Sequence, residues 1–298
     1  MAIKTYLADG FQPDFGIPWT PIPGDKELLS WPHEKLAAYL QFREECDQNA
    51  IKNPVGQGWI LPSWKMVMDG WKKYPVVVIL GGNRSSKSTI ASRLCVWAAG
   101  TIPNAEVRAY HVNEDRSIED QQRMIWDALP QGIKDLPTKK GISHSFQYSQ
   151  KNGFTDNICI LPPIKNGMRG GQIKFANYRQ YQADAQVAEG FKSHFIWCDE
   201  ECPQKLFETL QYRTIDYHGR IVLTFTTLSG WTPLVQDILG RTRTLESKFA
   251  PLLGRNVPVI QESISRPGTI IYYFHTEDNA FIDTSDFISK IKGRCVYW

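Results

Sequence analysis

Short runs of aliphatic and β-branched residues recur along this chain, and each run is followed by small or polar residues. The run 76–80 (Val-Val-Val-Ile-Leu) is continuous rather than alternating, which predicts a strand buried on both faces of a parallel sheet. Similar runs elsewhere in the chain predict further strands. The predicted strands are 76–80, 105–112, 173–176, 194–198, 221–226 and 269–274.

Segments with the apolar spacing of helices lie before and between these runs. The predicted helices are 33–49, 63–74, 88–99 and 117–129. The first ends at Asn53-Pro54, the second has Ser63 as its N-cap, and Gly100 ends the third. Because helices alternate with strands, the chain is predicted to form a doubly wound, mainly parallel α/β sheet preceded by an N-terminal helical arm.

Proline and glycine mark the remaining parts of the chain. This composition predicts an extended arm over residues 1–30 and an irregular connection over residues 130–171. We therefore expect three parts: an arm with helices over 1–74, an α/β core over 75–245, and a C-terminal part over 246–298.

Composition is that of an ordinary folded protein, with 42% hydrophobic and 22% charged residues, and the aromatic content of 12% argues against a disordered chain. The net charge of +3 is too small to identify a nucleic-acid binder. No apolar run is long enough to cross a bilayer, and the N-terminus carries no secretory signal. The six cysteines include no C-x-x-C pair, so a reduced intracellular protein is expected. Cys198 and Cys202 have a metal-like spacing without a second pair, which favours buried thiols over a zinc site.

The predicted strand 76–80 leads into a turn similar to the phosphate-loop template G-x-x-x-x-G-K-[ST]. The turn and the first helical residues are Gly81, Gly82, Asn83, Arg84, Ser85, Ser86, Lys87, Ser88 and Thr89. Small residues let backbone N–H groups surround phosphate oxygens at a helix N-terminus. Lys87 would reach the β- and γ-phosphates of ATP, and Ser88 would offer its hydroxyl to Mg²⁺. Ser86 departs from the template glycine, and the alternative is a serine-rich helix cap with a solvated Lys87.

A second strand ends in carboxylates, at Asp199, Glu200 and Glu201. In an open parallel sheet, the carboxyl ends of the strands form the ligand-binding edge, which places these acids beside the phosphate loop. Asp199 would hold Mg²⁺ through water, and Glu200 would act as the general base for the attacking water. Taken alone, this pattern also fits a solvated acidic turn.

A third strand ends in hydroxyl residues, Thr226 and Thr227, followed by a glycine turn. Such a strand end can sense the γ-phosphate and pass its loss to a neighbouring segment. Taken alone, it fits a threonine-rich strand equally well.

In this order, the segments GGNRSSKS, AEGFKSHFIWCDEECP and LTFTTLSGW resemble the ATPase domain of the terminase large subunit of tailed double-stranded DNA bacteriophages. The resemblance covers roughly residues 76–231, and the tail HTEDNAFIDTSDFISKIKGR is similar to the family's exit from this domain. It implies a P-loop NTPase fold in which residues 246–298 complete the ATPase domain as a lid and the start of a linker. It also implies an ATP- and Mg²⁺-dependent motor that translocates double-stranded viral DNA into a procapsid.

Carried over residue by residue, the resemblance gives Lys87 and Ser88 the phosphate and Mg²⁺ contacts, and Asp199 the role of Mg²⁺ holder. Glu200 becomes the catalytic glutamate, and Thr226 and Thr227 become the coupling motif. Arg84 matches an arginine that the family often carries inside the loop, in a cis or coupling role. The other residues that the resemblance brings in are Arg169 and Arg179 as candidates for an arginine finger in trans, and Gln57 and Trp64 in the region of the adenine contact.

The implied partners are double-stranded DNA, a portal protein, a small terminase subunit and further copies of the chain in a ring, usually pentameric. No membrane partner is implied. The implied location is the cytoplasm of the infected bacterial host, transiently at the portal vertex of the procapsid. The family usually continues into a nuclease domain, and because this sequence stops at Trp298, nuclease activity is not predicted.

Two other functions share these motifs. A helicase-like ATPase that remodels nucleic acid should carry a second motor-like lobe with its own arginine motif, and none is evident after Trp231. A nucleotide-binding assembly protein would bind ATP to order an oligomer, with turnover weakened by Ser86.

Overall fold

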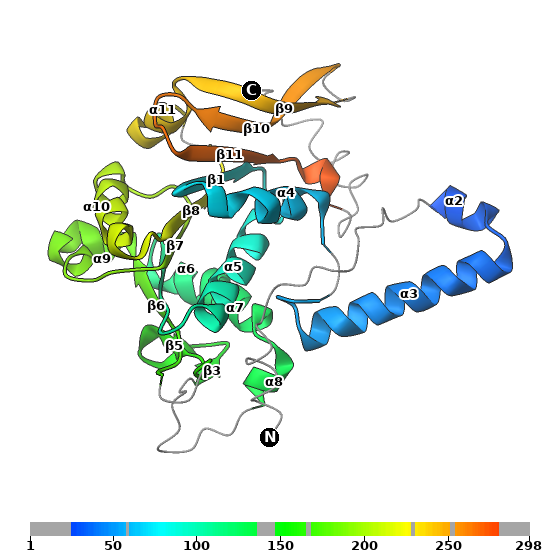
Figure 1. The fold of residues 1–298 in the computed structure, drawn as a ribbon, viewed down its shortest axis with the longest axis horizontal. Helices are drawn as coiled ribbons and strands as arrows, with labels where there is room; N and C mark the ends of the chain where they lie inside the picture. Colours follow the sequence, from blue (N-terminus) through cyan, green and yellow to red (C-terminus); the bar gives the residue numbers. More distant parts are fainter. Residues whose placement is uncertain are drawn as a thin grey trace.

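The computed structural model describes residues 25–57, 60–135, 147–164, 168–227, 230–250 and 254–279, and its ribbon is drawn in Figure 1. Within these residues, nine strands form one sheet in the order β5-β6-β2-β7-β8-β1-β11-β10-β9. The strands of this sheet are β1 Val76–Gly81, β2 Glu106–His111, β5 Ile158–Ile160, β6 Gln172–Asn177, β7 Phe195–Asp199, β8 Arg220–Phe225, β9 Thr242–Ala250, β10 Arg255–Ser263 and β11 Thr269–Phe274. A small separate pair consists of β3 Tyr148–Ser149 and β4 Gly153–Phe154.

The centre of the large sheet is parallel, from β6 through β2, β7, β8 and β1 to β11. The edge strand β5 and the hairpin β9–β10 are antiparallel. Since parallel strands all end at the same edge, the segments that follow β1, β7 and β8 meet there. This edge therefore carries all three motifs that the sequence singled out.

Helices flank the sheet on both faces (Figure 1). The α-helices are α2 Asp25–Ser30, α3 His33–Lys52, α4 Pro62–Gly70, α5 Lys87–Thr101, α6 Glu114–Arg116, α7 Arg123–Ala128, α8 Gln131–Lys134, α9 Tyr178–Ala183, α10 Gln204–Thr214 and α11 Pro233–Leu239. Single turns of 3₁₀-helix cover Trp71–Lys73, Thr155–Asn157, Ala185–Ala188, Ile215–Tyr217 and Thr276–Asp278. The helix α3 projects away from the sheet and carries α2 at its far end (Figure 1).

Two apolar clusters lie against the two faces of the sheet, because side chains alternate along each buried strand. On β1, Val77 and Ile79 pack with residues of α4, α5 and α7, whereas Val76 and Val78 pack with residues of α10 and α11. The continuous apolar run that predicted β1 is thus explained by burial on both faces. Among the described residues, no helix has the length and apolarity needed to span a membrane.

The predicted fold class and all six predicted strands are confirmed, with end positions shifted by at most one residue. Two predicted helix boundaries and part of the predicted extended arm were wrong. Leu61, not Ser63, is the N-cap of α4, because Pro62 occupies the first helical position, where its missing N–H costs nothing. Gly100 lies inside α5, which ends one residue later. Asp25–Ser30 is helical rather than extended, and residues 1–24 lie outside the described part.

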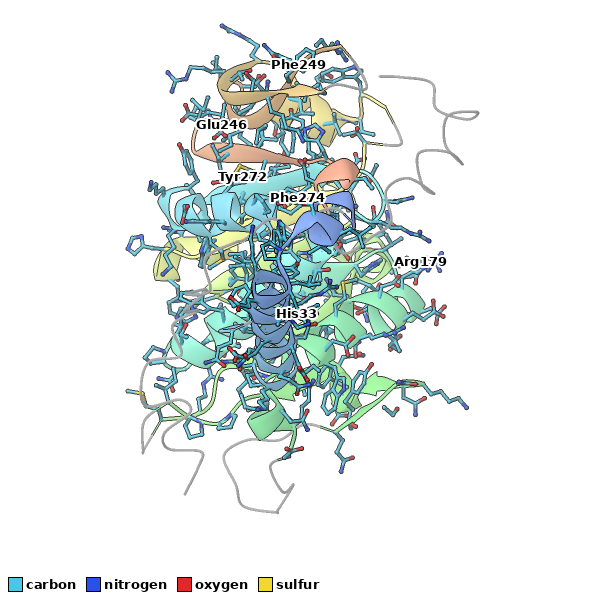
Figure 2. All side chains as sticks on the ribbon, turned by 90° about the vertical axis from the view of Figure 1, so that its right-hand side faces the viewer. His33, Arg179, Glu246, Phe249, Tyr272 and Phe274 are labelled. Atoms are coloured by element: carbon cyan, nitrogen blue, oxygen red, sulfur yellow. The ribbon has the colours of Figure 1, made fainter. Side chains whose placement is uncertain are left out.

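The hairpin β9–β10 was missed. Its strands are rich in charged residues and the second contains Pro258, so neither has the continuous apolar run that predicts a buried strand. The structure accommodates Pro258 next to an irregularity in the pairing of β10 with the edge strand β9, outside the three residues of β10 that pair with β11. Figure 2 shows Phe249 and Glu246 of β9 at the outer margin, with Tyr272 and Phe274 of β11 further in.

The predicted helix 117–129 is helical but not regular. It begins at Glu114, has π-helical geometry over Ser117–Gln122 and returns to an α-helix at Arg123. The buried Gln121 donates a hydrogen bond to the carbonyl of Tyr110, which fixes this turn to the end of β2. Residues 130–171 contain α8 and the strands β3, β4 and β5 instead of a wholly irregular connection.

Candidate active site

The turn between β1 and α5 has the backbone that the phosphate-loop template requires. Ser86 adopts the left-handed conformation (φ 65°), which explains why the template has glycine at this position. For a residue with a Cβ atom this conformation costs about 1–2 kcal/mol. Gly81 has no room for a side chain, since a Cβ there would lie 2.6 Å from the carbonyl oxygen of Phe274.

Side-chain hydrogen bonds hold Ser86 in this conformation. The indole Nε1 of Trp64 donates to Ser86 Oγ at 3.0 Å, and the hydroxyl of Ser86 donates to the carbonyl of Ser85. The Trp64 ring is also stacked under the guanidinium of Arg93, 4.4 Å from the ring centre. A glycine at position 86 would have no hydroxyl and could make neither of these hydrogen bonds. The serine lacks the conformational freedom of glycine, but its hydroxyl makes a hydrogen bond that connects α4 to the loop.

Lys87 opens α5 and is only 7% exposed. The only hydrogen-bond acceptor of its ammonium within the described residues is the carbonyl of Gly82, at a long 3.5 Å. A buried ammonium with so little local compensation is stabilised by a nearby anion. The beginning of a helix, with its free N–H groups, is where a phosphate fits.

Ser88 and Asp199 meet at the centre of the site. Ser88 Oγ donates to Asp199 Oδ1 at 2.9 Å, which joins the phosphate loop to the end of β7 across β8. Thr224 on β8 donates to the same oxygen at 2.6 Å. Burial raises the pKa of Asp199, and the hydrogen bonds from Thr224 and Ser88 and the charge of Lys87 oppose that rise. A hydroxyl and a carboxylate in contact are the oxygen ligands that Mg²⁺ prefers.

Glu200 follows on the exposed side of Asp199. Its backbone is in the left-handed region (φ 64°), and its N–H donates to the Thr224 carbonyl at 2.8 Å. The hydroxyl of Tyr178 donates to the carbonyls of Asp199 and Glu200, at 2.8 and 3.1 Å. Desolvation and the charge of Asp199 raise the pKa of Glu200, against the influence of Lys87. A carboxylate with a raised pKa is a better proton acceptor.

His111 also belongs to the site, and the sequence did not identify it. It ends β2, is 4% exposed, and its Nε2 lies 3.7 Å from Asp199 Oδ2. The N–H of Val112 donates to His111 Nδ1, so the proton of the neutral ring is on Nε2 and faces the carboxylate. Burial lowers the pKa of His111, which favours the neutral ring.

Two further segments close the edge around the loop. Thr226 Oγ1 donates to the carbonyl of Gly81 at 2.7 Å, and Thr227 follows it at the end of β8. On the other side, Thr276 donates to the Asn83 carbonyl at 3.1 Å and Asn279 to the Arg84 carbonyl at 2.6 Å. The turn after β11 was not predicted to touch the loop, because only the pairing of β11 with β1 brings it there.

Comparison with solved structures yields matches to large terminases. No family model matches the sequence, and no curated protein matches it. The ATPase domain of the large terminase of Thermus phage P74-26 superposes with a TM-score of 0.52 at 14% identity, over 80% of this chain and 90% of that domain. The chain has the fold of a large terminase ATPase domain. A large terminase from a thermophilic bacteriophage gives a TM-score of 0.50 at 10% identity over 78% of this chain, which spans about half the length of that protein.

Within this terminase ATPase fold, the three arginines occupy different places. Arg84 in the loop is exposed, has a positive φ of 62° and makes no ion pair with the described residues. Arg169 pairs with Glu106 at the start of β2, on the edge opposite the loop. Arg179 lies in the first turn of α9, after β6, exposed and without an ion pair to the described part of the chain. Figure 2 shows Arg179 at the margin of the molecule.

The remaining predicted residues are placed as follows. Glu201 accepts a hydrogen bond from Thr232 at the start of α11. Gln57 is exposed beside the end of α3, while the indole of Trp64 is engaged with Ser86. Cys198 and Cys202 are both buried, and burial raises the pKa of Cys198. No group of three metal-ligating side chains is present in the described ranges.

Three observations show that the residues at this edge of the sheet suit ATP and Mg²⁺. Lys87 is buried and short of acceptors. The buried hydroxyl of Ser85 has no hydrogen-bond partner in the loop, where a phosphate would supply one. Finally, Ser88 and Asp199 offer a hydroxyl and a carboxylate side by side. This donor set suits an anion on one side and a hard divalent cation on the other.

The left-handed backbone at Glu200 generates a prediction about stability. Replacing Glu200 by glycine removes the steric cost of φ 64°, whereas alanine keeps that cost and loses the same carboxylate. We expect the free energy of unfolding of the Glu200→Gly variant to be about 1 kcal/mol larger than that of Glu200→Ala, so that the glycine variant is the more stable. Urea denaturation of both variants measures the difference. Equal stabilities would mean that the backbone at Glu200 is not strained.

Proposed function

We propose that this chain hydrolyses ATP and is the motor domain of a terminase large subunit, which translocates double-stranded viral DNA into a procapsid. The observation that carries the proposal is the contact of 2.9 Å between Ser88 and Asp199, which unites the phosphate loop with the acidic strand end. A serine-rich helix cap or a solvated acidic turn would not require this contact. The terminase ATPase fold supports the same assignment at the level of architecture.

Each residue of the loop has a defined task in this proposal. The backbone N–H groups of 82–88 and the ammonium of Lys87 bind the β- and γ-phosphates, because they combine positive potential with small side chains. Ser88 and Asp199 would hold Mg²⁺, the serine directly and the carboxylate through water. When bound, Mg²⁺ supplies positive charge that offsets the charge on the phosphate oxygens.

Glu200 acts as the general base in the proposed reaction. It follows Asp199 on the open side of the edge, where a water molecule can reach it, and its raised pKa favours proton transfer from that water. The hydrogen bonds from Tyr178 fix the two backbone carbonyls that flank the Cα atom of Glu200. They therefore limit the directions in which the Glu200 carboxylate can point.

The residues at the end of β8 are proposed to couple ATP hydrolysis to the movement of DNA. Thr226 holds the carbonyl of Gly81 at the start of the loop, so a displacement of the phosphates can pass to β8 and to Thr227. Arg84, exposed inside the loop, is proposed to act in cis on the same nucleotide or in coupling. The partners proposed are DNA, a portal protein, a small terminase subunit and other copies in a ring, with assembly at the procapsid in the host cytoplasm.

The conformation of Ser86 supports turnover over the alternative of a purely structural nucleotide site. The serine has the backbone angles that glycine would have, so the departure from the template leaves the path of the loop unchanged. Its hydroxyl is engaged with Trp64 and Ser85.

Exchange of Glu200 for glutamine tests the reaction. The amide cannot accept the proton, so we expect phosphate release to fall by at least about 100-fold, while the dissociation constant of ATP changes little. Steady-state phosphate release with duplex DNA and calorimetric ATP binding measure the two effects. The matched control is Glu201→Gln, because Glu201 is engaged with Thr232 and should leave turnover within a few-fold of wild type. Equal rates in wild type and Glu200→Gln would remove Glu200 from the base role.

Mixed assemblies test whether an arginine acts in trans. Arg179 is the favoured candidate, since Arg169 is already paired with Glu106. We expect Arg179→Ala and Glu200→Gln each to be inactive alone. An equal mixture should recover about a quarter of the wild-type rate, because half of the sites keep Glu200 and half of their neighbours keep Arg179. An equal mixture of Arg169→Ala and Glu200→Gln is the comparison. No recovery with Arg179→Ala would exclude it as a finger in trans.

A further inference from the structure

The carboxylate of Asp199 is nearly enclosed by protein, with the whole residue only 3% exposed. A carboxylate at such a depth needs hydrogen bonds from its surroundings. Ser88 supplies one of these bonds, but its hydroxyl lies on the phosphate loop and would also have to serve Mg²⁺. A second donor that belongs to the rigid sheet is therefore of particular importance.

Thr224 is that second donor. Its hydroxyl lies 2.6 Å from Asp199 Oδ1, and the other acceptor within reach, the carbonyl of Cys198, is at 3.5 Å. The indole Nε1 of Trp197 lies 2.7 Å from the same hydroxyl oxygen. An indole nitrogen only donates, so it occupies a lone pair of Thr224 and leaves the hydroxyl proton for Asp199. Donation into a hydroxyl also strengthens the hydrogen bond that the hydroxyl makes onward.

The register of the parallel strands brings these three side chains together. Asp199 pairs with Thr224 across β7 and β8, so the two side chains lie on the same face of the sheet. Trp197 precedes Asp199 by two positions and therefore points to that face as well. Both Trp197 and Thr224 are fully buried, and Trp197 belongs to the cluster packed against α5, the helix that begins with the phosphate loop.

We propose that Thr224, whose hydroxyl accepts a hydrogen bond from the indole of Trp197, is a positioning residue that holds the Asp199 carboxylate turned toward Ser88, ready for Mg²⁺. This inference rests on the proposed function and adds to it a fixed hydrogen-bond relay from the core of the sheet. The relay anchors Oδ1 through Thr224 and leaves Oδ2 facing His111.

Without the Thr224 hydroxyl, the carboxylate of Asp199 would lose its hydrogen bond to the sheet and could rotate away from Ser88. A carboxylate rotated away from Ser88 would be a poorer ligand for a divalent cation.

The test compares Thr224→Val with Thr224→Ser. Valine has the shape of threonine without its hydroxyl, whereas serine keeps the hydroxyl. Calorimetry with the non-hydrolysable analogue adenylyl imidodiphosphate, once with Mg²⁺ and once with EDTA, gives the gain in affinity that Mg²⁺ provides. We expect this gain to fall about tenfold in Thr224→Val, with binding in EDTA unchanged, and to stay within twofold of wild type in Thr224→Ser.

Valine leaves the Trp197 indole without its acceptor, which can impair folding. The double variant Trp197→Phe with Thr224→Val removes both polar partners and tests the same point if the single variant does not fold. It should also lose the Mg²⁺-dependent gain.

Three results would overturn the inference. A folded Thr224→Val protein, or a folded double variant, with the wild-type gain from Mg²⁺ would show that the relay does not position Asp199. An equal loss of affinity in Mg²⁺ and in EDTA would indicate a general structural role. Wild-type protein that binds the analogue in neither condition would contradict the proposed function itself and the relay with it.

Discussion

A buried carboxylate beside a buried lysine is the constraint around which the active edge of this protein is arranged. Asp199 and Lys87 are both almost inaccessible to water, and their charges stabilise each other without forming a direct ion pair. Direct neutralisation would leave neither group able to bind an anion or a cation. Instead, hydroxyl groups stabilise the acid and a single carbonyl contacts the lysine. Together, the lysine and the carboxylate suit a phosphate group and its metal ion.

The backbone around these two residues adopts conformations that cost free energy. Among the described residues other than glycine, seven have a positive φ: Arg84, Ser86, Asn104, Asp156, Asn157, Glu200 and His218. Asparagine, aspartate and histidine adopt this region comparatively easily, whereas arginine, serine and glutamate do not. All three of the unfavourable cases lie at the active edge, two in the loop and one after Asp199. Strain of this kind persists only where the surrounding structure enforces it, and it clusters at functional sites.

The sequence predicted the parts of the site that follow one another along the chain. The loop after the first buried strand and the acids after another are local patterns, each with its own residue types. The neighbours Thr224, Trp197, His111 and Tyr178 could not be found in this way, because their contacts depend on which strands are adjacent and in which register. No spacing in the chain reveals that β8 lies between β1 and β7. The hairpin β9–β10 escaped prediction because its edge position permits charged residues and Pro258.

A structure with Mg²⁺ and a non-hydrolysable ATP analogue tests the central claim most directly. The account predicts that Lys87 Nζ leaves the carbonyl of Gly82 for the β- and γ-phosphates, and that Ser88 Oγ ligates Mg²⁺. Asp199 should remain hydrogen-bonded to Thr224, with Glu200 facing a water molecule beyond the γ-phosphate. A triphosphate bound elsewhere on the molecule, or one with no contact to Lys87 and no metal between Ser88 and Asp199, would contradict it.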